Sequence, residues 1–130
     1  MIAVLGPAAL VAGCGESHHA IGTRPPEPIT VTALIDGSRV KASPASFGAG
    51  PVVVLVSNQS GRAQRMTFES AGSGPGIRSS TAVPLDGTAQ LQVSPKRGSY
   101  QLSVRDQGIH PASIKVGDKR RSAQNTLLRP

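Results

Sequence analysis

Two segments in which apolar and polar residues alternate, Thr88–Val93 and Ser99–Arg105, flank the turn Ser94–Gly98. A period of two places successive side chains on opposite faces of a strand. The two segments are therefore predicted to pair as a β-hairpin with one dry and one wet face, to which the other strands are added. The residues expected on the dry face are Leu91, Val93, Tyr100, Leu102 and Val104.

Other parts of the chain carry the same signal. Ile29–Ile35 alternates and ends at an Asp-Gly turn. Val52–Ser57 is apolar at both parities, which predicts a central strand covered on both faces. Phe47 is expected to plug one end of the core. Weaker strands are expected at Arg39–Ser43, Arg65–Glu69, Ile77–Val83 and Ala112–Val116. Seven or eight short strands favour an all-β sandwich.

Composition agrees with one small β domain. The chain has 130 residues, with 15 Gly and 11 Pro to make turns, and only 2% aromatic residues. The core must therefore consist of Val, Ile, Leu and Ala. The net charge of +7 comes from scattered Lys and Arg, with one run at Lys119–Arg121. Because almost no aromatic side chain is present to stack on bases, attraction to an anionic membrane surface is a more natural use of this charge than nucleic-acid binding.

The first 13 residues are apolar, uncharged and too short to span a bilayer as a helix. They lead to Cys14, the only cysteine. The sequence Val11-Ala12-Gly13-Cys14 resembles the bacterial lipobox. That resemblance implies a lipoprotein signal peptide at 1–13, cleavage before Cys14, a diacylglyceryl thioether on Cys14 and acylation of the new amino terminus. Acyl chains such as palmitate would then anchor the protein to the outer face of the cell membrane.

Two other interpretations of this segment stay open: an ordinary secretory signal with an incidental cysteine, or a disordered apolar tail. No Lys or Arg precedes the apolar run, so we expect the true start to lie upstream or the positive region to be minimal. A single exported thiol has no internal partner for a disulfide, which agrees with lipidation.

Polar segments flank the expected domain. Residues 14–28 are rich in Pro and Gly and predict a flexible linker whose His18 and His19 are solvated rather than metal ligands. Residues 118–130 form a polar, basic tail, which we expect to be a solvated end. The alternative is that Leu127-Leu128 docks on the domain or on a partner.

The order of strands and turns resembles the cupredoxin-like domains of exported bacterial proteins. The resemblance covers residues 29–117 and implies a Greek-key β-sandwich. The matching residues are Ile29–Ile35, Gly50–Val54 with Asn58, Leu85–Thr88, Leu91–Val93, Gly98–Tyr100 and Ile114–Val116.

The same resemblance argues against copper. In copper-binding members a His follows the Asn-containing turn, a Cys follows the Gly-x-Tyr, and a His and often a Met come later. The corresponding positions here are Gln64–Met66, Val104 and His110, with no later Met. A blue-copper centre needs two imidazoles and a thiolate. We therefore expect no metal or other cofactor, and His110 is expected to be a loop residue.

No catalytic constellation is apparent, because the acidic residues fall mostly in expected turns and nothing orders a nucleophile with a base. The favoured hypothesis is a non-enzymatic, membrane-anchored lipoprotein of the bacterial envelope that binds another protein or has a structural role. A second hypothesis is weak copper or zinc handling through His18, His19 and His110. A third is an immunoglobulin-like adhesive module, which differs only in its partner.

Overall fold

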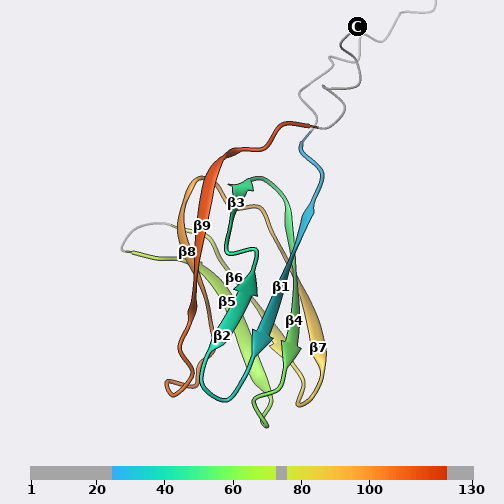
Figure 1. Ribbon diagram of the computed structural model, residues 1–130, viewed down its shortest axis with the longest axis vertical. Helices are drawn as coiled ribbons and strands as arrows, with labels where there is room; N and C mark the ends of the chain where they lie inside the picture. Colours follow the sequence, from blue (N-terminus) through green and yellow to red (C-terminus); the bar gives the residue numbers. More distant parts are fainter. Residues whose placement is uncertain (1–24, 73–75, 123–130) are drawn as a thin grey trace, which may run out of the picture.

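The protein folds as two β-sheets packed face to face (Figure 1). The computed structural model describes residues 25–72 and 76–122, and the account below concerns those residues. Within them the all-β class is confirmed. The strands are β1 (Ile29–Ile35), β2 (Val40–Ser43), β3 (Ser46–Ala49), β4 (Val52–Asn58), β5 (Gln64–Ser70), β6 (Arg78–Val83), β7 (Thr88–Val93), β8 (Gly98–Ser103) and β9 (Ala112–Lys119).

One sheet has four strands in the order β2-β1-β4-β7, and the other has five in the order β3-β9-β8-β5-β6. Two pairs are parallel: β1 with β4, in register from Ile29 opposite Val52 to Ile35 opposite Asn58, and β3 with β9. The remaining pairs are antiparallel. Parallel neighbours cannot be joined by a tight turn, so the chain must cross between the sheets to form them.

The core is the layer between the sheets, and aliphatic side chains dominate it as the composition requires. Alternation along each strand buries one face and leaves the other partly in solvent. Phe68 and Tyr100 stack with ring centroids 5.0 Å apart. The largest side chains with almost no exposure are Phe68, Ile35, Met66, Leu102, Ile114, Val31, Val52, Val54, Val56 and Val83.

The predicted hairpin is wrong, although both of its strands exist. β7 pairs with β4 in one sheet, whereas β8 lies between β5 and β9 in the other. The turn between them carries Pro95, which is buried and has no N–H to donate to a ladder, while its carbonyl accepts a bond from Gly50 N at 3.3 Å. The turn therefore leads the chain from one sheet to the other. Leu91, Tyr100 and Leu102 are buried as predicted, and Val93 and Val104 are half-buried.

The prediction for Val52–Ser57 is half right. β4 is central, between β1 and β7, but it is not covered on both faces, because Leu55 is 43% exposed and Val53 and Ser57 are only half-buried. Its outward side chains are Val and Leu although no described layer covers that face.

Two boundaries also differ from expectation. Phe47, which was expected at one end of the core, lies in strand β3, outside any predicted strand, and is half-buried against the core. β9 continues to Lys119, past the expected domain end at residue 117, because its later residues are held by pairing with β3.

Truncating the core at Leu102 should destabilise the domain. Leu102 has 0% exposure, so Leu102→Ala is expected to cost about 2–5 kcal/mol in the free energy of unfolding through lost burial and the cavity left behind. Leu85→Ala is the matched control, because Leu85 is 53% exposed. Urea unfolding of both variants measures the difference, and equal losses would contradict the assignment of the core.

Candidate functional site

The sandwich has two poles that differ in what they carry (Figure 1). The loop pole, at the bottom of Figure 1, consists of the connections 36–39, 59–63, 84–87 and 104–111. The terminal pole, at the top, consists of residues 25–28, 50–51, 94–97 and 120–122, where the described chain begins and ends. Both poles and one sheet face are candidates for function.

The positions that would hold copper by resemblance lie at or near the loop pole. Met66 is fully buried in the core. Val104 is partly buried and packs against the same core. Gln64 Nε2 donates to Ser60 Oγ at 3.0 Å. Only His110 offers an imidazole, and it is exposed. Among the described residues no three His, Cys, Asp or Glu side chains gather. These side chains do not supply the two imidazoles and thiolate of a blue-copper centre, so the group does not fit here.

The backbone of His110 has a structural contact. Its N–H donates to the carbonyl of Ser38 at 2.9 Å, and its carbonyl accepts from Val40 N at 2.8 Å. These bonds tie the loop before β9 to the turn between β1 and β2, across the two sheets. His110 thus lies in the connection before β9, where its backbone forms an isolated bridge with Arg39.

Asn58 closes the loop pole, a role that sequence reasoning missed. It is 1% exposed, and its Nδ2 donates to the carbonyls of Arg62 at 2.7 Å and Pro84 at 3.1 Å. Its Oδ1 accepts from the N–H and hydroxyl of Ser60 at 3.0 and 2.7 Å. One buried side chain thus joins two loops, and the Asn-x-Ser turn was the only signal for it.

Asp36 organises the neighbouring turn. Its Oδ1 accepts hydrogen bonds from the N–H of Ser38 at 2.7 Å and of Arg39 at 2.8 Å. These bonds, that of Ser38 first, favour the ionised form and lower the pKa of Asp36 to about 2. Lys41 adds a weak attraction at 3.6 Å.

The terminal pole is built around Arg120, which the sequence had placed in a solvated tail. Its Nε donates to Gly48 O at 3.0 Å, Nη1 to Glu27 O at 2.8 Å, and Nη2 to Pro51 O. The guanidinium therefore joins the end of the described chain to two segments remote in sequence, at residue 27 and at residues 48–51. Its partial burial lowers its pKa. For Arg120 the prediction of a solvated end is wrong, whereas Lys119 and Arg121 are exposed.

Exposed basic side chains surround Arg120. Lys96 and Arg97 line two neighbouring surface depressions with volumes of about 380 and 540 Å³, and Lys119 lines the first of these as well. Arg97 Nη1 pairs with Asp118 Oδ1 at 3.0 Å, and both side chains are largely exposed. Such a pair is worth little in stability, so Arg97 is available to an external anion.

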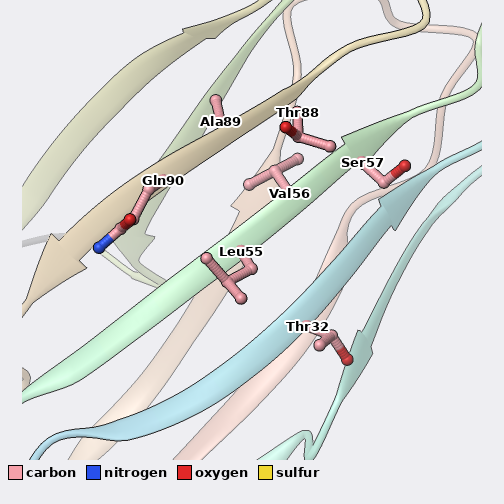
Figure 2. Close-up of a pocket in the computed structure, with 7 residues that line it drawn as sticks. All are labelled: Thr32, Leu55, Val56, Ser57, Thr88, Ala89 and Gln90. Carbon is pink, nitrogen blue, oxygen red and sulfur yellow. The ribbon is translucent and has the colours of Figure 1, made fainter.

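A third depression, of about 460 Å³, lies on the outer face of the four-stranded sheet (Figure 2). Leu55 of β4 lies between Thr32 of β1 and Gln90 of β7, and the surface is mostly apolar. Its polar groups are hydroxyls and one amide, with no titratable side chain among its lining residues. It can bind by shape and apolar contact but offers no acid, base or ionised nucleophile.

The predicted lipid site at Cys14, and the histidines His18 and His19, lie outside the described residues. In the part of the chain that is described, no helix is long and apolar enough to cross a membrane.

Comparisons with known proteins place the fold. No protein-family model matches the sequence, and no curated protein matches it. The structure is similar to that of auracyanin A, a "blue" copper protein from the green thermophilic photosynthetic bacterium Chloroflexus aurantiacus, with a TM-score of 0.55. The two are 13% identical, and the match covers 70% of this chain and 100% of that one. The cupredoxin-like fold expected from the sequence is confirmed, and a Greek-key sandwich agrees with it.

The Asp36 turn should impose a pH dependence. Because folding lowers the pKa of Asp36 from 3.8 to about 2, its contribution to stability is fully present above pH 4 and is lost as the pH falls through 2. NMR titration of the carboxylate should give the midpoint. Asp36→Asn should unfold more easily than the wild type at pH 5, and this difference should shrink by pH 2. A midpoint near 4 in the folded protein would contradict the hydrogen bonding described.

Adding cupric ion to the purified protein should produce no intense blue colour, because the loop pole supplies no thiolate beside His110. Titration followed by absorbance and calorimetry measures this. The control is the triple variant His18→Ala, His19→Ala and His110→Ala. Stoichiometric binding tighter than roughly micromolar in the wild type, lost in the variant, would support the metal-handling hypothesis instead.

Proposed function

We propose that this protein is a non-enzymatic lipoprotein of the bacterial cell envelope: a cupredoxin-like domain held at the outer face of the cell membrane by lipid on Cys14. The domain acts by binding another envelope component or as a structural module, without a blue-copper site. The observation that carries the proposal is the sequence Val11–Cys14 before a polar linker and an all-β domain.

The position at which the chain enters the domain supports the proposed membrane tether through Cys14. Arg120 holds the carbonyl of Glu27 at the terminal pole, so the linker joins the domain at a fixed point. The 11 residue-to-residue steps from Cys14 to Pro25 span at most roughly 40 Å, since an extended chain covers about 3.6 Å per residue. A lipid on Cys14 would therefore keep the terminal pole within that distance of the bilayer.

The chain has a single cysteine, Cys14, and this supports the part of the proposal that excludes a blue-copper site. A blue-copper centre requires a thiolate, and the only cysteine of the chain is Cys14. A sulfur in thioether linkage to a lipid has no thiolate to offer. Acylation at Cys14 and a blue-copper site are thus alternatives for this chain.

The outer sheet face supports a role in binding rather than catalysis. The depression around Leu55 joins apolar surface to hydroxyl and amide groups, which suits contact with another surface. Its lining provides no group with the pKa or nucleophilicity that acid–base or covalent chemistry needs.

Cys14→Ser should release the protein from membranes, because the serine hydroxyl cannot take the thioether-linked lipid. The measurement is fractionation of cells expressing each form, with membranes washed in about 1 M salt, where the Debye length of about 3 Å removes electrostatic adhesion. Metabolic labelling with palmitate should mark the wild type only.

Ser17→Ala is the matched control for that experiment, because it changes a hydroxyl in the linker and leaves Cys14 intact. It should fractionate and label as the wild type does. Equal membrane retention of Cys14→Ser and the wild type after the salt wash would reject lipid anchoring.

A further inference from the structure

Positive charge is concentrated at the terminal pole. Among the described residues it carries the four cations Lys96, Arg97, Arg120 and Arg121 and the carboxylate of Glu27, and the adjoining end of β9 adds Lys119 and Asp118. At the loop pole, Arg39, Arg62 and Arg105 are matched in number by Asp36, Asp86 and Asp106. The asymmetry is a property of the fold, since the cations of the terminal pole come from two separate stretches of sequence.

Those cations share one surface. Lys96 and Arg97 belong to the turn that crosses from β7 to β8, and Lys119 ends β9, yet they line the same depression with Ala49 and Pro95. Lys96 and Lys119 have no carboxylate within ion-pair distance in the described part of the chain. The bonds of Arg120 to Gly48 and Glu27 fix the end of β9 beside the linker.

We propose that the terminal pole is a membrane-docking surface that binds the headgroups of anionic phospholipids. The inference rests on the proposed lipid anchor in one respect: a tether at Cys14 would attach the domain to the bilayer through this pole and keep the pole within reach of the headgroups. Docking then orients the domain, with the loop pole directed away from the headgroups and the Leu55 face at the side of the sandwich.

The electrostatic attraction between these cations and an anionic leaflet suits the orientation of the domain rather than its anchoring to the membrane. Each Lys or Arg close to an anionic leaflet raises the partition coefficient about fivefold, and the effect fades within a Debye length of about 10 Å at 0.1 M salt. Cations at one pole act together only when that pole faces the membrane. The charges at the loop pole lie at the opposite end of the strands, out of range in the same orientation.

Nucleic acid is a poorer match for this surface. The aromatic side chain nearest these cations is Tyr100, whose ring is 6% exposed and whose hydroxyl donates to Lys96 O at 2.7 Å. It is therefore unable to stack on a base, and a single strand would gain only phosphate contacts.

The test uses the full chain with Cys14→Ser, so that no acyl chain contributes to binding. Its partition onto vesicles of phosphatidylglycerol and phosphatidylcholine is compared by sedimentation with that onto phosphatidylcholine alone. The apolar residues 1–13 are the same in every variant, so the ratio of the two partition coefficients isolates the effect of lipid charge. The expected ratio is well above ten at about 0.1 M salt and near one at about 1 M.

Two double variants locate the surface. Lys96→Glu with Lys119→Glu should lower the ratio at least tenfold. Arg39→Glu with Arg105→Glu changes the net charge by the same amount at the loop pole and should lower it less than threefold. All four substituted side chains are exposed, and equal unfolding midpoints would establish that both variants fold.

Two results would overturn the proposal: a ratio near one for the parent protein, or equal losses in both double variants, which would indicate net charge without a defined surface. Neither bears on the lipid anchor, because this protein carries no lipid. Conversely, failure of the Cys14 fractionation test would leave the vesicle ratios unchanged, so the two proposals fail separately.

Discussion

The apolar layer between the two sheets is the constraint on which this structure depends. Each sheet has one dry face, so neither can exist in water without the other. The layer contains few aromatic residues: Phe68 stacks on Tyr100, and the other core side chains are mostly aliphatic. Such a core gains its stability from close packing of branched side chains. The poles, by contrast, are closed by polar side chains that bond to backbone carbonyls.

The class of fold and the strands were predictable from the sequence, because the alternation of apolar and polar residues indicates which face of a strand is buried. The pairing of strands was not. Alternation along β7 and β8 is the same whether they join as a hairpin or face each other across a core. In the structure the turn between them packs Pro95 into the interior, and the sequence does not show burial of a turn proline. The resemblance to cupredoxin-like domains implied a Greek-key sandwich, but the pairing predicted for β7 and β8 was still wrong.

The side chains that organise the poles were the least predictable. Asn58 and Arg120 each bond to carbonyls from two or more segments, and these segments meet only after the sheets have packed. A polar residue in a turn and an arginine in a basic run give no hint of such partners. Asp36 is the exception, because an Asp-Gly turn between strands is a local motif whose hydrogen bonds stay within the next few residues.

The single sulfur ties the proposals for this chain together. A cupredoxin-like fold presents its loop pole as the natural place for a metal, but the side chains there are Val104, the buried Met66 and one exposed imidazole. The only cysteine of the chain, Cys14, instead precedes the predicted linker and is far from His110 in the sequence. If that sulfur carries lipid, the terminal pole with its cations becomes the membrane side. The loop pole and the sheet face around Leu55 are then the surfaces left for a partner in the envelope.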